Sequence, residues 1–144
     1  MLLVACASEL PAMTPDSTAS PGSSAPTDPF SLARTAPDAP EEIRGTASVA
    51  SCGHLVLRVA AVLPPDATEC LERKIGSERA ELAVAQFTTE GDPIVTFYLT
   101  YPDLAGYDVV VDQRQDSFSN GGFARYRCAG AKTLDDADVS CSDR

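Results

Sequence analysis

The sequence IVTFYLTY, residues 94–101, alternates apolar and more polar side chains from Val95 onward. Successive side chains of a β-strand point to opposite faces, so every second residue of this segment lies on one face. The side chains on the more apolar face are Val95, Phe97, Leu99 and Tyr101. The pattern therefore predicts a strand that covers a core with this face.

Turn signals and further strand patterns flank this segment. Pro102–Gly106 has the length and content of a hairpin loop, and Asn120–Gly122 is typical of a turn. The strands that we expect are Leu82–Thr88, Ile94–Tyr101, Tyr107–Val111, Phe123–Cys128 and a closing segment with Ala137, Val139 and Cys141. Short loops between consecutive strands predict an antiparallel meander.

An apolar run and a helix pattern precede the meander. Leu55–Leu63 is rich in β-branched residues and predicts a strand, which Pro64 and Pro65 end. Asp66 and Glu69 have the spacing of a capping box, so we expect a helix over about residues 67–75. The sequence thus predicts an α+β domain, with one short helix packed on an antiparallel sheet of about four to five strands.

The chain has five cysteines, at positions 6, 52, 70, 128 and 141. An odd number in an exported protein needs an explanation, and no spacing matches a CxxC metal or redox pair. If Cys6 is modified, the other four can form two disulfides in three alternative pairings, which sequence alone leaves open. We favour Cys52–Cys70, between the first strand and the helix, and Cys128–Cys141, across the last hairpin.

Residues 3–6, Leu-Val-Ala-Cys, resemble the lipobox of bacterial lipoproteins. In those proteins the cysteine receives a diacylglyceryl thioether and becomes the first residue after signal peptide cleavage. A secretory signal carries ~7–15 apolar residues before the cleavage site, and residues 1–6 are too short for that. Either the true start lies upstream of Met1 or the match is a coincidence. We favour the first, with lipidation at Cys6.

Composition divides the rest of the chain in two. Residues 7–41 are rich in proline, serine, threonine and alanine, and Phe30 and Leu32 are their only sizeable apolar pair. Such a segment buries too little apolar surface to order itself, so we expect a disordered linker. The composition changes near Glu42, and we expect residues 42–144 to form one disulfide-braced domain.

The order of motifs in the second half also resembles a known family. A TTEGDPI segment, residues 88–94, leads into the central strand. A VDQRQDSF segment, residues 111–118, comes after that strand, and Cys128 comes later. This order is similar to an uncharacterised domain family of Gram-positive bacterial lipoproteins, over about residues 81–141. The resemblance implies export, lipid anchoring and a small disulfide-bonded domain, and it implies no reaction. The motif residues are Thr89, Glu90, Gly91, Asp92, Pro93, Asp112 and Asp116.

Four of these residues are carboxylates that could converge at one end of the sheet: Glu90, Asp92, Asp112 and Asp116. Two carboxylates with separated pKa values could perform acid–base catalysis, as in glycoside hydrolysis. A simpler interpretation makes residues 90–93 a turn, in which Gly91 supplies the positive φ. We favour the turn.

A calcium site is a further alternative, because Asp112–Asp116 and Asn120 place oxygen ligands in one loop. An EF-hand is excluded, since Arg114 occupies its third position and Phe123 its twelfth. A weak, irregular calcium site remains open.

His54 is the single histidine, and it stands two residues after Cys52. We expect Cys52 in a disulfide, so a cysteine or serine nucleophile activated by His54 is disfavoured, as is a zinc site. Aromatic side chains on the strands form either core and ordinary sheet surface or a recognition surface. They are Phe97, Tyr98, Tyr101, Tyr107, Phe118, Phe123 and Tyr126, and Tyr98 is the one most expected to face a partner.

The formal net charge of −10 argues against a nucleic-acid partner, which needs a basic face. We expect a monomeric, secreted lipoprotein of the cell envelope, anchored to the extracytoplasmic face of the membrane through Cys6. Its domain is expected to bind an envelope protein or polysaccharide, with no cofactor and no catalysis. The alternatives are an acid–base hydrolase of envelope material and a weak calcium-binding module.

Overall fold

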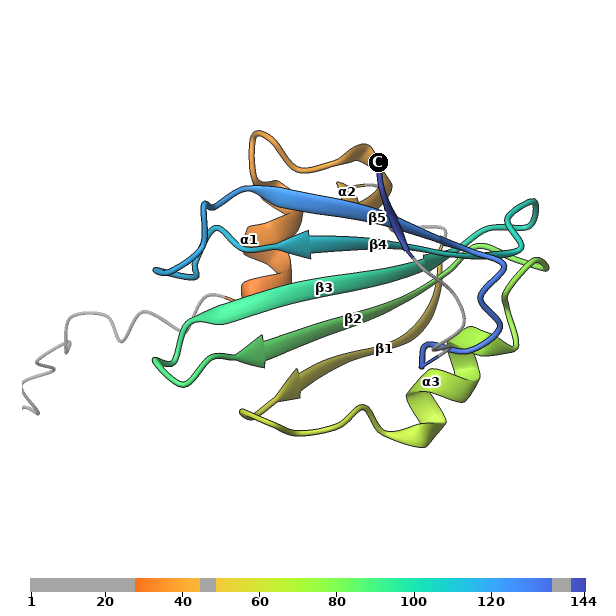
Figure 1. Ribbon diagram of the computed structural model, residues 1–144, viewed down its shortest axis with the longest axis horizontal. Coiled ribbons are helices and arrows are strands. Elements are labelled where there is room, and N and C mark those ends of the chain that lie inside the picture. The colour runs from red at the N-terminus through yellow and green to blue at the C-terminus, as the bar shows by residue number, and fades with distance from the viewer. Residues whose placement is uncertain (1–27, 45–48, 136–140) are drawn as a thin grey trace, which may run out of the picture.

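The computed structural model describes residues 28–44, 49–135 and 141–144, and its centre is one six-stranded sheet with its strands in chain order. The elements are α1 (Pro29–Thr35), α2 (Glu41–Arg44), β1 (Ala50–Leu57), α3 (Pro65–Glu72), β2 (Ala80–Phe87), β3 (Pro93–Thr100), β4 (Gly106–Asp112), β5 (Phe123–Ala129) and β6 (Ser142–Asp143). Helices α1 and α2 cover one face of the sheet and α3 lies on the other (Figure 1). Cys6, residues 7–27 of the expected linker, and Ala137 and Val139 lie outside the described residues.

The α+β class is confirmed, with one or two more strands than expected. Strands β2 to β5 form the predicted antiparallel meander. On β3, Val95, Phe97 and Leu99 are fully buried on the side of α1, as the alternation predicted. The central strand therefore has the register that its sequence pattern indicated.

Strand β1 departs from the meander, because it pairs with β2 in parallel. Parallel neighbours need a crossover, and α3 provides it. The strand also ends at Leu57 rather than at Leu63, since Ala60 has a positive φ of 60° and Val62 is 85% exposed. Only the first part of the apolar run is therefore a strand.

Helix α3 begins two residues earlier than the capping box predicted. Pro64 is its N-cap and makes no side-chain capping bond, and Pro65 occupies the first turn. The fixed φ of proline suits this position, so Asp66 lies inside the first turn instead of capping it. The expected capping box is wrong for this reason.

Residues 28–41, which composition assigned to the linker, fold with the domain. Asp28 caps α1 by accepting hydrogen bonds from the backbone N–H groups of Phe30 and Ser31. The helical layer contributes Phe30, Ala33, Ala36, Ala39 and Ile43 to the core over the sheet. Alanine is common in linkers, but here its small side chains let the helical layer lie close to the strands. The predicted boundary at Glu42 is therefore wrong.

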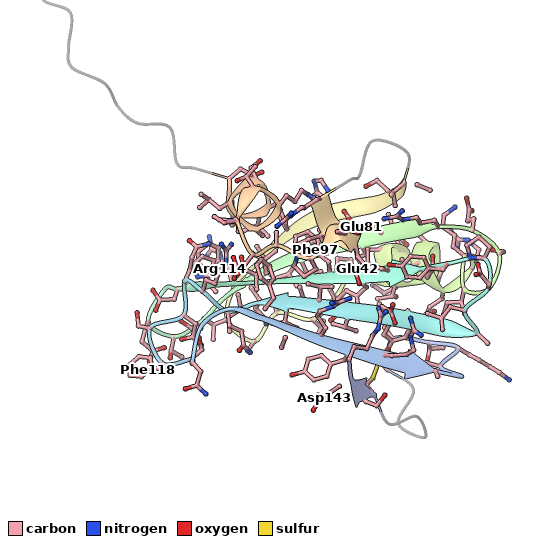
Figure 2. The ribbon with its side chains drawn as sticks, turned by 90° about the horizontal axis from the view of Figure 1, so that it is seen from above. Glu42, Glu81, Phe97, Arg114, Phe118 and Asp143 are labelled. Carbon is pink, nitrogen blue, oxygen red and sulfur yellow. A yellow bond between two sulfur atoms is a disulfide. The ribbon has the colours of Figure 1, made fainter. Side chains whose placement is uncertain are left out.

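A buried ion pair ties this layer to the sheet. Arg34 of α1 donates to both carboxylate oxygens of Glu81 on β2, and Arg34 and Glu81 are 14% and 4% exposed. The same guanidinium donates to the carbonyl of Ile43 at 2.8 Å and lies 4.8 Å from the ring centroid of Phe97. Figure 2 shows Glu81 and Phe97 beneath the helical layer. One side chain thus joins α1, α2 and two strands.

Both disulfides have the favoured pairing. Cys52 on β1 is joined to Cys70 in α3, and Cys128 on β5 is joined to Cys141 just before β6. Each bridge therefore attaches a peripheral segment to the sheet.

We predict that Arg34→Met lowers the free energy of unfolding by about 3–5 kcal/mol, because it leaves Glu81 buried without its counter-charge. Urea denaturation followed by circular dichroism measures this change. Arg73→Met is the matched control, since Arg73 and its partner Glu69 are 68% and 64% exposed. Its effect should stay below about 1 kcal/mol.

The double variant Arg34→Met/Glu81→Leu distinguishes two causes of destabilisation, the unpaired charge of Glu81 and the lost packing of Arg34. We expect it to recover most of the loss, because it removes both charges and leaves apolar side chains in their place. A loss as large as that of Arg34→Met would mean that packing of the arginine, and not the unpaired carboxylate, causes the destabilisation.

Candidate functional site

The motif residues lie at one end of the sheet, where one of them, Asp92, joins two loops. The carboxylate of Asp92, in the turn between β2 and β3, accepts hydrogen bonds from the backbone N–H and the hydroxyl of Ser117 at 2.9 and 2.7 Å. Ser117 lies in the loop between β4 and β5. Gly91 has a φ of 92°, and the N–H of Gly91 donates to the carbonyl of Thr88. The structure thus has a turn here, but at residues 88–92 and not at 90–93, since Pro93 is the first residue of β3.

The other three motif carboxylates have separate hydrogen-bond partners. Glu90 accepts from the hydroxyl of Thr89 at 2.7 Å. Asp112 is 1% exposed and binds Arg114 through both oxygens, at 2.7 and 2.6 Å. Asp116 accepts from a backbone N–H two residues further on, at 3.0 Å.

The hydrogen bonds to Glu90 and Asp92 shift the pKa of these two carboxylates in the wrong direction for an acid catalyst. The hydroxyl of Thr89 lowers the pKa of Glu90, and the backbone and side chain of Ser117 lower the pKa of Asp92. A general acid in glycoside hydrolysis needs a raised pKa. The hydrogen bonds of the motif therefore fit a structural contact between two loops better than a catalytic pair of carboxylates.

The loop between β4 and β5 also gives little support to a calcium site. In the described part of the chain, no group of three or more His, Cys, Asp or Glu side chains is placed to hold a metal ion. Arg114 engages both oxygens of Asp112, and its guanidinium lies 4.7 Å from the ring centroid of Phe123. It also donates to the carbonyl of Leu32 at 3.2 Å, which ties the loop to α1.

His54 lies near a serine and a carboxylate but does not form a relay with them. A bulge at Gly53, where φ is 119°, separates Ser51 and His54, which line one cavity of about 120 Å³ with Glu81. The Nε2 atom of His54 is 3.7 Å from Glu81, too far for a hydrogen bond. Both oxygens of Glu81 bind Arg34, and at this distance the carboxylate does not orient the imidazole.

The aromatic side chains do not gather on one surface. Tyr98 packs edge to face on Tyr107, with 6.1 Å between ring centroids, in the core that α3 covers. This burial raises the pKa of Tyr98. Most of the sheet face on the α3 side is therefore a second core. Tyr98 is only partly buried, however, and lines an apolar hollow of about 300 Å³ on the same face, so its role in contacting a partner stays a prediction. Phe118 is 79% exposed and lies at the end of its loop, away from Glu42 (Figure 2).

Tyr101 differs from the other aromatics, because it lines two adjoining hollows on the α2 side of the sheet. Their volumes are about 330 and 280 Å³, and they share Glu42 and Tyr101. We call them together the Glu42–Tyr101 pocket. Its lining residues are Glu41, Glu42, Arg79, Tyr101, Asp103, Leu104, Asp108, Arg127 and Arg144.

Charged side chains of both signs alternate around this pocket. Asp108, which is 1% exposed, accepts from Arg127 at 2.8 and 3.0 Å and from Arg144 at 2.5 Å. Glu42 accepts from Arg125 and lies 3.5 Å from Arg144. Each of these two carboxylates thus contacts two guanidinium groups, with Arg144 shared between them, and these contacts fix the walls of the pocket.

Three side-chain polar atoms are buried without a hydrogen-bond partner in the described residues, and all three belong to this region. They are the hydroxyl of Tyr101, Nε of Arg79 and Nε of Arg125. The guanidinium of Arg79 lies 5.7 Å from the Tyr101 ring centroid. Burial raises the pKa of Tyr101, so its hydroxyl keeps its proton at neutral pH. Folded proteins rarely leave such groups unpaired, so this region has unused hydrogen-bonding capacity.

Sequence analysis named Tyr101 as a possible recognition aromatic and missed the charged residues around it. The available signal was the strand register: Arg125 and Arg127 alternate on β5, opposite Val110 and Asp108 of β4. Charged residues at positions that face a core indicate a buried polar network.

A further hollow, of about 300 Å³, lies on the α3 side of the sheet and has no charged lining. It is formed mainly by the segment 57–63 with side chains of β2 and β3, and Val59 at its rim is 50% exposed. Its lining is uncharged, whereas charged side chains line the Glu42–Tyr101 pocket.

Comparison with known proteins found no family model, no curated protein and no solved structure that matches this chain. None of the helices in the described residues is long and apolar enough to cross a membrane. The function therefore has to be argued from the chemistry of the pocket and from the sequence.

The hydrogen bonds between Asp92 and Ser117 predict that the stability of the domain depends on pH. Ser117 lowers the pKa of Asp92 below the ordinary value of about 3.9. Stability that depends on this carboxylate is thus present above about pH 4 and is lost as the pH falls through the folded-state pKa. Ser117→Ala removes the hydroxyl donor and should raise the pKa of Asp92, measured by NMR titration of the carboxyl carbon. Ser77→Ala, whose hydroxyl bonds to Lys74, should leave it unchanged; an unaltered pKa in Ser117→Ala would contradict the assignment.

Proposed function

We propose that this protein is a cell-envelope lipoprotein, anchored to the extracytoplasmic face of the membrane through an acylated Cys6. Its domain binds an envelope partner at the Glu42–Tyr101 pocket and does not catalyse a reaction. The lipobox-like residues 3–6 and the resemblance of residues 81–141 to a family of bacterial lipoproteins support the anchor. Two disulfides support export, since such bonds persist in oxidising compartments.

One observation carries the binding role. The buried polar atoms without partners in the described residues all belong to Arg79, Tyr101 and Arg125, beside one concave and charged surface. Ligand sites are concave and place a few polar groups for orientation, often at a cost in internal hydrogen bonding. No comparable observation favours the hydrolase or the calcium-binding module.

The anchor is tested on the protein made from its own gene in its own host. We expect mass spectrometry to find acyl mass on an amino-terminal Cys6 and the other four cysteines oxidised. Cys6→Ser should move the protein from the membrane fraction to the soluble fraction. Recovery of the unaltered protein in the soluble fraction, with an unmodified amino end and five free thiols, would overturn the proposal.

The binding role is tested with the full chain carrying Cys6→Ser and a solubilised envelope extract of the host. We expect saturable shifts of backbone amide signals around Glu42, Arg79 and Tyr101 in NMR spectra. Tyr101→Phe removes a hydroxyl and should weaken binding about two- to tenfold, the value of one hydrogen bond. Tyr107→Phe is the matched control, since its hydroxyl bonds to the carbonyl of Leu134 at 3.2 Å in the other core. Shifts confined to the apolar hollow, or no shifts, would contradict this site.

A further inference from the structure

We infer that the Glu42–Tyr101 pocket takes a neutral ligand rich in hydroxyl groups, of the size of one or two sugar rings of an envelope polysaccharide. This inference rests on the proposed binding function and names the ligand class of that site. It follows from the charge balance of the pocket, its hydrogen-bonding groups and its size.

The pocket is balanced in charge although the chain is not. The chain has a formal net charge of −10. The pocket is lined by the carboxylates of Glu41, Glu42, Asp103 and Asp108 and by the guanidinium groups of Arg79, Arg127 and Arg144. Arg125 on β5 does not line the pocket, but it binds Glu42 and balances the fourth carboxylate. An anion would meet exposed Asp103, and a cation would meet half-exposed arginines. A charged ligand of either sign therefore gains no net electrostatic attraction, so the pocket favours a ligand without a net charge.

The hydrogen-bonding groups suit hydroxyls. A hydroxyl donates one hydrogen bond and accepts up to two, whereas a guanidinium only donates and a carboxylate only accepts. Tyr101 and Nε of both Arg79 and Arg125 have unused capacity, and Glu42 stands beside them with carboxylate lone pairs to spare. A sugar hydroxyl in contact with such a guanidinium and carboxylate can use both of its roles at once. These three atoms are buried, so a ligand reaches them only when the side chains move.

The size of the pocket and its polarity narrow the class further. Volumes of about 330 and 280 Å³ lie at the lower end of the range for ligand pockets, ~300–1,000 Å³. The partly exposed ring of Tyr101 offers a flat surface to one sugar face. A protein partner fits less well, because the centre of a protein interface is depleted in charged residues. An apolar ligand would prefer the uncharged hollow on the α3 side.

The test uses the full chain with Cys6→Ser, amide NMR titrations and sugars of defined charge. The neutral probes are glucose, mannose, galactose, arabinose and N-acetylglucosamine with its dimer, and the charged analogues are glucosamine and glucuronate. We expect at least one neutral sugar to shift the amides around Glu42, Arg79 and Tyr101, at least fivefold more tightly than either charged analogue. Its affinity should be the same at 50 and 500 mM salt, since no net charge is screened. Tyr101→Phe should weaken it about two- to tenfold and Tyr107→Phe should not.

Each other outcome decides against the inference. Tighter binding of glucosamine or glucuronate, with salt dependence, overturns the neutral class. Pocket shifts with the envelope extract but with none of the sugars overturn the ligand class and leave the proposed function standing. If protease treatment of the extract abolishes the pocket shifts, the partner is a protein, and the proposed ligand class is again overturned. Absence of pocket shifts with both extract and sugars overturns the inference and the proposed function together.

Discussion

Three carboxylates stand on the core-facing side of the sheet, and the fold depends on the arginines that neutralise them. Glu81 on β2 and Asp108 and Asp112 on β4 are each 3% exposed or less. A buried carboxylate without a counter-charge is strongly unfavourable, so each must be met by a cation in good geometry. Each is bound by two N–H groups of one arginine. Arg34 lies on α1 and Arg114 in the β4–β5 loop, so their bonds attach these peripheral segments to the sheet, whereas Arg127 lies on β5 itself. Arg144, which also binds Asp108, attaches the β6 segment.

Local patterns predicted the centre of the fold and not its edges. Residues 95–101 have a period of two, and this determined which side of β3 is buried. The helical layer was missed, because its alanines and prolines have the composition of a linker. Its decisive contact, between Arg34 and Glu81, joins residues 47 positions apart, and no pattern within one segment reveals such a pair. The parallel pairing of β1 was missed for a similar reason: it follows from the path of α3 over the sheet.

The candidate site shows the same division. The turn at the motif was predicted within two residues of its place, 88–92, because glycine with positive φ and aspartate are local signals. The pocket draws on α2, β4, β5 and the segment after β3, so its residues are scattered along a hundred positions of the chain. One feature of the strands indicated the pocket. Asp108 and Arg127 stand opposite each other at core-facing positions of neighbouring strands.

Helix α1 lies outside both disulfide-closed loops, which span residues 52–70 and 128–141. It is also the first described element of the chain, so it would be the first to bear tension from a tether on that side. Tension would act on Asp28 and then on the Arg34–Glu81 bond, while no covalent cross-link shares the load. If α1 peeled away, Val95 and Phe97 would be uncovered with both cystines intact. In the proposed topology, the attachment nearest the membrane is thus one that neither disulfide reinforces.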